Sequence, residues 1–282
     1  MKSKMQLDHV VIAVRDLDDA SRTYRKLGFN VVAGGVHGHA PTRNALIVFS
    51  DGSFMELIEW TARSPGDAWQ RTLEAHGEGL VDFALTTQDL NDVFARARSN
   101  GIEMGGPIAG SRTTPEGVVL QWQTGRPASR ELPFVCLDIT ARAERVPTGD
   151  VRIHPNGVTG VIAVVVAVVD AYTSLDRYLG AFDIHEGSRF DLTEMGVRVG
   201  IADLASWQLV LISNTASAPT GLAASVHRRA ARRGVGPCAL VLRSPGTQEA
   251  RTIKPADACG VPLRLCAGRE PPNSYLDSLL QA

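Results

Sequence analysis

The sequence predicts an α+β fold of four β-α-β-β-β units, the fourth degenerate, arranged as two similar halves. One observation is an internal repeat, because His-Val-Val-Ile-Ala-Val-Arg-Asp at 9–16 returns as Ala-Val-Val-Val-Ala-Val-Val-Asp at 163–170. Farther along, Met-Glu-Leu-Ile at 55–58 returns as Leu-Val-Leu-Ile at 209–212. A second observation is the recurring order of strand-like and helix-like segments within each unit. Internal similarity of this kind is the first guide to a fold.

The first unit shows the pattern most clearly. An apolar run at 7–14 reads as a strand, and Asp16 is suited to cap a helix over 17–27. Four apolar residues of that helix lie at helical spacing: Leu17, Ala20, Tyr24 and Leu27. Gly28 ends the helix. Strands are then expected at 29–33, 44–50 and 53–59.

The remaining units follow the same order. The second has strands at 81–86, 102–108, 117–123 and 133–139, with a helix after Asp89. The third spans 161–213, and the fourth begins at Cys238 and is degenerate, because 244–260 is rich in Pro and Gly. The segment 141–156 carries Pro and Gly and marks the boundary. We therefore expect a first domain at 1–145, which holds the site, and a structural second domain at 155–282.

Composition limits the classes of function. Apolar residues make up 44% of the 282 residues and charged residues 21%, which is typical of a folded globular protein. The net charge of −1 offers no general attraction to nucleic acid or to an anionic membrane. The apolar run at 158–169 is too short to span a bilayer. The four cysteines form no CxxC pair and indicate reduced thiols, so we expect a cytoplasmic protein; a homodimer is compatible with the sequence.

Three polar residues of the first half are absent from the repeat. His9 aligns with Ala163, Glu56 with Val210, and Asp82 with Ala239. An ionisable side chain in the middle of an apolar strand is costly to bury without a partner or a metal. The scaffold is repeated while these side chains are not, which indicates that the first half uses them for chemistry.

These motifs resemble the vicinal-oxygen-chelate superfamily, the group of glyoxalase I, extradiol dioxygenases and fosfomycin-resistance proteins, and within it the glyoxalase-like domain branch. The resemblance rests on Leu-Asp-His-Val-Val-Ile-Ala-Val at 7–14 and on four further motifs in order. They are Gly34-Gly35-Val36-His37, Thr42-Arg43-Asn44-Ala45-Leu46, Glu56-Leu57 and His154-Pro155-Asn156-Gly157. It covers about 6–160 and implies that each pair of units rolls its sheets into a half-open barrel.

The resemblance also implies a divalent metal in the cup of the barrel. Its ligands would be His9 and Glu56 from the first unit and Asp82 from the first strand of the second. The last strand of the second unit offers Cys136 or Asp138, and Asp138 is favoured. Such an oxygen-rich set suits Mg²⁺, Mn²⁺, Zn²⁺ or Ni²⁺ and departs from the two-histidine, one-carboxylate set of iron(II) oxygenases. Absence of a metal stays an alternative.

Several further residues are candidates to contact a substrate. His37 and His39 lie in a Gly-rich loop near the expected cup, and His37 is a candidate general base beside Glu56. Asn44, His154 and Trp122 are candidate substrate contacts, although each also has a structural interpretation. Three arginines are candidates to hold an anionic substrate: Arg43, Arg112 and Arg126.

The expected function is that of a metal-dependent lyase, isomerase or hydrolase acting on a small oxygen-bearing metabolite in the N-terminal cup. Fold alone does not choose among these reactions. The alternative is a non-catalytic protein of the same fold that sequesters a small compound, as resistance proteins of the superfamily do. In both cases the second half serves to cover the first.

Overall fold

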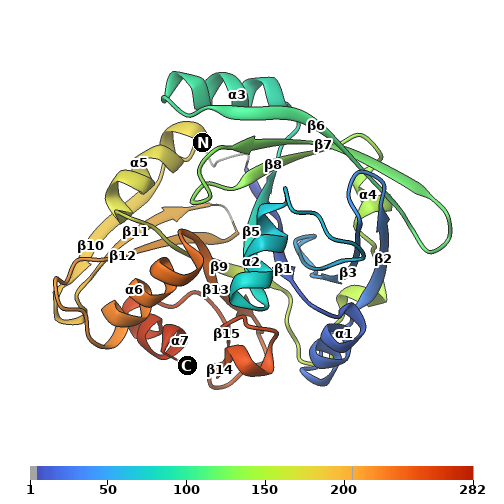
Figure 1. Cartoon of the computed structure of the whole chain (residues 1–282). Helices are drawn as coiled ribbons and strands as arrows, with labels where there is room; N and C mark the ends of the chain where they lie inside the picture. The colour runs from blue at the N-terminus through green and yellow to red at the C-terminus, as the bar shows by residue number, and fades with distance from the viewer. Residues whose placement is uncertain (1–4, 205, 282) are drawn as a thin grey trace.

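The computed structural model describes residues 5–204 and 206–281 and has the predicted α+β architecture (Figure 1). Its strands form two sheets, a closed barrel from the first half and a seven-stranded sheet from the second. These two sheets match the two expected halves. No helix within the described ranges is both long and apolar enough to cross a membrane.

The barrel has the strand order β1-β4-β3-β2-β6-β7-β8-β5. Its strands are β1 (Gln6–Ala13), β2 (Val32–His37), β3 (Thr42–Val48), β4 (Phe54–Trp60), β5 (Gly79–Thr86), β6 (Met104–Thr113), β7 (Val119–Pro127) and β8 (Phe134–Asp138). Its helices are α1 (Leu17–Lys26), α2 (Ala68–His76), α3 (Leu90–Ser99) and α4 (Arg142–Arg145). The barrel closes more fully than the expected half-open form, because β2 pairs with β6 through Val36–Thr113 and His37–Arg112.

The second sheet has the order β10-β11-β12-β9-β13-β15-β14. Its elements are β9 (Gly160–Ala167), α5 (Ala171–Ala181), β10 (Gly187–Leu192), β11 (Val197–Asp203), β12 (Gln208–Asn214), α6 (Gly221–Arg233), β13 (Gly236–Arg243), β14 (Arg251–Ile253), β15 (Leu263–Cys266) and α7 (Leu276–Leu280). Where the second unit has α3, β6 and β7 between its first and last strands, the fourth has only the three-residue β14 and a short 3₁₀ turn, Pro255–Asp257. The fourth unit is therefore degenerate, as predicted, and this sheet stays open.

The repeat extends to irregularities of the backbone. Asp8 is skipped in the pairing of β1 with β5, and Ile162 is skipped at the same place in the pairing of β9 with β13. A β-bulge of this kind turns the side chains of neighbouring residues and is common beside functional sites. In the first half the bulge brings Asp8 and His9 together; in the second it carries Ile162 and Ala163.

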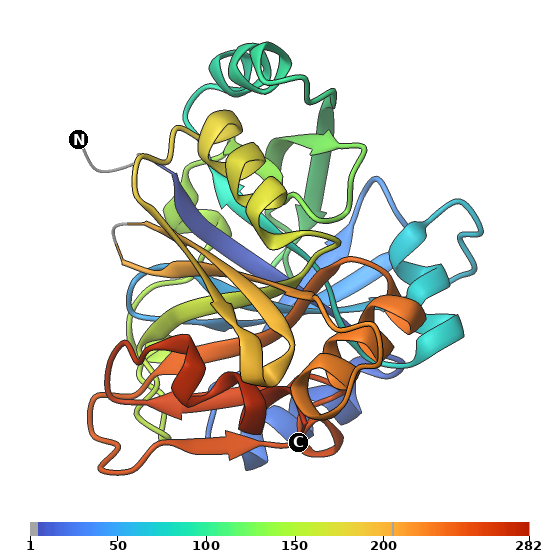
Figure 2. The same cartoon turned by 90° about the vertical axis from the view of Figure 1, so that its left-hand side faces the viewer.

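One apolar core lies between the barrel and the second sheet. It joins residues such as Tyr24, Ile47 and Phe83 to Leu209 and Leu242. Figures 1 and 2 both show α5 beside α3, and the two helices are joined where Asn100 Nδ2 donates to the Gly180 carbonyl oxygen, 3.1 Å away. The halves thus share buried surface.

Candidate functional site

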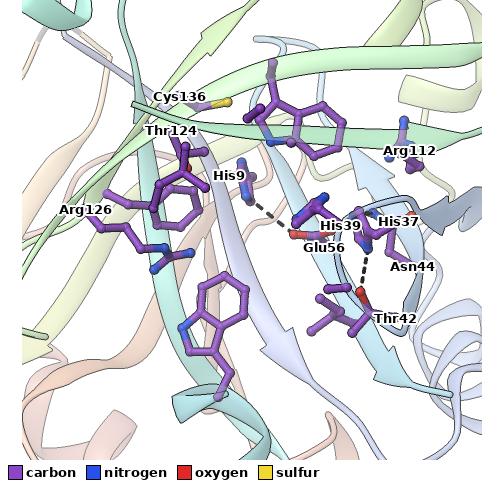
Figure 3. Close-up of a pocket in the computed structure, with 18 of the residues that line it drawn as sticks. His9, His37, His39, Thr42, Asn44, Glu56, Arg112, Thr124, Arg126 and Cys136 are labelled. Carbon is purple, nitrogen blue, oxygen red and sulfur yellow. Dashed lines mark hydrogen bonds and ion pairs between the residues drawn. The ribbon is translucent and has the colours of Figure 1, made fainter. Parts of the chain in front are cut away.

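A cavity of about 360 Å³ lies inside the barrel (Figure 3). Strands β1, β3 and β4 supply its polar wall, strands β6, β7 and β8 the opposite wall, and the start of α2 lies at its edge. The side chains that line the cavity include His9, His37, Asn44, Glu56, Trp69, Arg112, Trp122, Arg126, Phe134 and Cys136. The cavity is therefore polar on one side and largely aromatic on the other.

The structure brings His9 and Glu56 together in this cavity. Their strands run side by side in parallel, and both side chains point inward and are buried. His9 Nε2 lies 3.5 Å from Glu56 Oε2. The imidazole ring also stacks on Phe54, with ring centroids 4.7 Å apart, which fixes its orientation.

The second oxygen of Glu56 faces different partners. Asn44 Nδ2 donates a hydrogen bond to Oε1 at 2.5 Å, and His37 Nε2 lies 3.6 Å from the same oxygen. His37 is held by its other nitrogen, because Nδ1 lies 2.8 Å from Thr42 Oγ1. Figure 3 shows His9 and His37 on opposite sides of Glu56. The carboxylate is thus flanked by two imidazoles and an amide.

Burial controls the charge of these groups. Desolvation lowers the pKa of His37 to about 4, although Glu56 opposes the shift, so His37 is neutral at neutral pH. Burial raises the pKa of Glu56, but His9, His37 and the hydrogen bond from Asn44 outweigh it and leave that pKa below its ordinary value. At neutral pH the site therefore contains an ionised carboxylate beside a neutral imidazole.

Asp8 is a functional neighbour that sequence reasoning missed. Its Oδ1 lies 3.6 Å from His9 Nδ1, on the side of the ring away from Glu56. Arg145 donates to both oxygens of Asp8, at 2.7 and 3.0 Å, and Arg142 donates to Oδ1 at 3.0 Å. Burial raises the pKa of Asp8, but the arginines hold it well below its usual value. The β-bulge at Asp8 brings this side chain beside His9, and no sequence pattern predicts the bulge.

The other two predicted metal ligands lie elsewhere. Asp82 Oδ2 accepts hydrogen bonds from Arg126 Nη1 at 2.8 Å and from Trp69 Nε1 at 3.1 Å. Asp138 is paired with Arg145 and with Arg142. Neither acid lines the cavity beside His9 and Glu56, and each is ion-paired with arginine.

Of the two alternatives on β8, Cys136 lines the cavity, not the favoured Asp138. Burial raises the pKa of the Cys136 thiol well above its usual value, so it is a neutral thiol and a poor ligand. No group of three or more His, Cys, Asp or Glu side chains within 5–204 and 206–281 is arranged to hold a metal ion. The donor set of this barrel does not fit the predicted metal.

The predicted substrate contacts divide into two groups. Asn44 and Trp122 line the cavity. His154 is instead buried outside it, where Nε2 lies 3.0 Å from the Val48 carbonyl oxygen and Nδ1 accepts from the amide of Asn30. Arg43 bonds Glu59 Oε2 at 2.5 Å and Asp18 Oδ2 at 3.3 Å, away from the cavity. These last two side chains tie elements of the fold together.

Arg112 and Arg126 do reach the cavity. Arg112 is only 4% exposed, has no carboxylate within 4 Å in the described chain, and leaves Nε without a hydrogen-bond partner. Sequence reasoning missed Trp69, whose helix starts at the capping residue Asp67. A second tryptophan, Trp122, lies on the strand paired with Gly110. The glycine leaves room for the Trp122 indole, since a Cβ there would lie 2.3 Å from Nε1.

Comparison with known proteins places this geometry in a family. The family model described as "Glyoxalase-like domain" matches residues 7–181, the whole barrel and the first helix of the second half. No curated protein matches the chain. The glyoxalase-like family model covers more than half of the sequence.

Solved structures support the fold. A hypothetical protein from Staphylococcus aureus is 14% identical, with a TM-score of 0.69 over 93% of this chain and 99% of its own. A mutant of 4-hydroxymandelate synthase from Streptomyces coelicolor is 15% identical, with a TM-score of 0.61 over 100% of this chain and 98% of its own. At such identities the likeness concerns the fold alone. The chain belongs to the glyoxalase-like domain family.

Proposed function

We propose that this protein is an enzyme that moves a proton on a small oxygen-bearing metabolite held in the barrel, with an isomerase or lyase outcome. The observation that carries the proposal is the setting of Glu56. Asp8 and Glu131, the other buried acids of the described chain, are ion-paired with arginine, whereas Glu56 has no arginine or lysine within 4 Å in that part of the chain and faces His9 and His37. A buried carboxylate that faces a cavity and has no arginine or lysine in direct contact is suited to accept a proton.

The proposed step uses residues of this chain alone. The Glu56 carboxylate removes a proton from a carbon next to a carbonyl; the C–H electron pair forms a C=C bond, and the π pair of the C=O bond moves onto the oxygen to give an enolate. Arg112, a cation in the same cavity, stabilises the negative charge on that oxygen. Return of the proton from Glu56 to the far carbon of a conjugated enolate shifts the double bond and gives isomerisation. Departure of a leaving group from the next carbon with its bonding electron pair, and its protonation by Glu56, gives elimination. Neutral His37 donates or accepts a hydrogen bond beside the reacting atoms.

A divalent metal is the second candidate, besides Arg112, for the group that stabilises the negative charge on the substrate oxygen. His9 and Glu56 supply two ligands, while the remaining predicted acids are neutralised by arginine. We therefore propose a reaction without a metal. Removing Mn²⁺, Mg²⁺, Ni²⁺ and Zn²⁺ with EDTA is expected to leave activity unchanged. Stoichiometric bound metal together with loss of activity in EDTA would refute this part of the proposal.

The test of the main proposal is exchange of substrate hydrogen for deuterium in D₂O. A panel of small 2-oxo acids, ketones and hydroxy acids is incubated with the protein and followed by proton NMR. Glu56→Gln is expected to slow exchange by about 10²–10⁴-fold, the usual contribution of a general base. Glu59→Gln is the matched control, since Glu59 is on the same strand but bonds Arg43. Equal exchange in wild type and Glu56→Gln would exclude Glu56 as the base.

A further inference from the structure

We infer that Arg126 binds a carboxylate group of the substrate, and that the substrate is a small carboxylic acid with a flat apolar body. The inference rests on the proposed function in taking the barrel cavity as the substrate site. It adds a chemical class for the ligand and a residue that selects it.

Arg126 is held rigidly at the aromatic side of the cavity. The carbon at the centre of its guanidinium lies 4.5 Å from the centroid of the Trp69 ring and 4.3 Å from that of Phe134. Its Nη1 is anchored 2.8 Å from Asp82 Oδ2. Figure 3 shows the guanidinium directed into the cavity. Cation–π contacts and an ion pair therefore fix the group before any ligand binds.

The anchoring uses only part of the hydrogen-bonding capacity of Arg126. A guanidinium has five N–H donors in a planar fork. Within the described chain, its one hydrogen bond is that from Nη1 to Asp82, so Nε and Nη2 keep donors for a ligand. The side chain is 36% exposed, so a molecule in the cavity can reach these donors. A planar fork of this kind matches both oxygens of a carboxylate.

Asp82 does not cancel this preference for an anion. Asp82 contacts the guanidinium only at Nη1, and desolvation raises the pKa of Asp82 even though Arg126 acts to lower it. Its other contacts are a hydrogen bond from Trp69 Nε1 and one from the amide of Phe83. Asp82 therefore orients the guanidinium through Nη1 and leaves Nε and Nη2 to donate to a ligand.

The remaining lining defines the rest of the ligand. Trp122, Phe54 and Ile108 supply apolar surface in the cavity that also holds Glu56 and Arg126. A cavity of about 360 Å³ accommodates a small molecule. Arg112 is 4% exposed, donates to the Arg145 carbonyl oxygen, and is already used at the substrate carbonyl oxygen in the proposed reaction.

The test measures binding of two probes that differ in charge and not in shape, 3-phenylpropionate and 3-phenylpropionamide. Calorimetry gives the affinities, and tryptophan fluorescence confirms binding near Trp69 or Trp122. The wild type is expected to prefer the carboxylate by at least about tenfold, as for a charged hydrogen bond. Arg126→Met should reduce the preference to about one, and Arg126→Lys should give an intermediate value.

Arg198→Met is the matched control. Arg198 also lies over an aromatic ring, Tyr172 at 4.5 Å, and is also ion-paired, but it is in the second half. It should leave the preference unchanged. Asp82→Asn, which frees the guanidinium, should strengthen carboxylate binding several-fold and keeps the test informative if Arg126→Met does not fold.

Two results would overturn the inference: equal binding of the two probes by the wild type, or full carboxylate preference in Arg126→Lys and Arg126→Met. Glu56→Gln should keep a preference at least as large as that of the wild type, since the assay needs no turnover and the variant removes a negative charge from the cavity. Glu56-dependent exchange without carboxylate preference would therefore refute the role of Arg126 alone. Carboxylate preference without exchange would refute the proposed reaction alone.

Discussion

The two halves of this molecule have the same scaffold and opposite interiors. On the inner face of the barrel, His9 and Glu56 border a cavity. On the equivalent face of the second sheet, Ala163 and Val210 are fully buried in an apolar cluster. The comparison separates the residues that both halves need in order to fold from the polar residues that only the first half carries.

Helices fill the second interior. Leu222 and Val226 of α6 and Leu276 and Leu279 of α7 pack in the same cluster as Val210. In the barrel, α2 is the counterpart of α6 and contributes Trp69 to the cavity edge instead. This packing is the basis on which we predict a structural role for the second half.

Residues kept in both halves are structural. Arg43 pairs with Asp18 and Glu59, and its equivalent Arg198 pairs with Asp170 and Asp191. A polar residue that recurs with the same kind of partner belongs to the scaffold. This explains why Arg43, a predicted substrate contact, lies outside the cavity.

The largest expected effect comes from separating the halves. A fragment of residues 1–153 should be insoluble or unfolded, because the apolar core joins both halves and its loss exposes a large apolar patch. Sedimentation and circular dichroism measure the outcome. A soluble, folded fragment would show that the barrel is independent of the second sheet.

Glu56 and Val210 occupy equivalent positions in the two halves. Placing each residue at the other position should affect stability in the second half and activity in the first. Val210→Glu buries an unpaired charge at a residue that is 0% exposed, and should lower the free energy of unfolding by at least about 3 kcal/mol. Glu56→Val should change it by less than about 1 kcal/mol while abolishing activity. Chemical denaturation compares both with Val210→Ala. Similar losses at the two positions would contradict the division into a working and a structural interior.

The smallest effect concerns pH. The pKa of His37 is about 4 in the fold against 6.5 in the unfolded chain, so the unfolded chain takes up a proton first as pH falls. His37 should thus contribute up to roughly 3 kcal/mol above pH 6.5, lost progressively between pH 6.5 and 4. His37→Gln should show a shallower pH dependence of unfolding over this range. The exposed His185→Gln is the control, and equal slopes in His37→Gln and wild type would exclude the burial effect.

Much of the fold follows from local patterns. Asp16 and Asp89 were predicted as helix caps and accept hydrogen bonds from the first turns of α1 and α3. The degenerate fourth unit follows from its Pro and Gly content. The second strand instead runs over Val32–His37, later than the expected 29–33, because pairing with β6 extends it.

The site was only partly predictable for a physical reason. The repeat by itself determined that His9 and Glu56 differ from the scaffold, since a missing counterpart is visible in the sequence. Whether a buried carboxylate faces a cavity or an arginine depends on side chains far apart in the chain. Arg126 reaches Asp82 across 44 positions, and Arg145 reaches Asp8 across 137. Only the tertiary structure decided that these two arginines neutralise Asp82 and Asp8, while Glu56 keeps its charge beside two imidazoles.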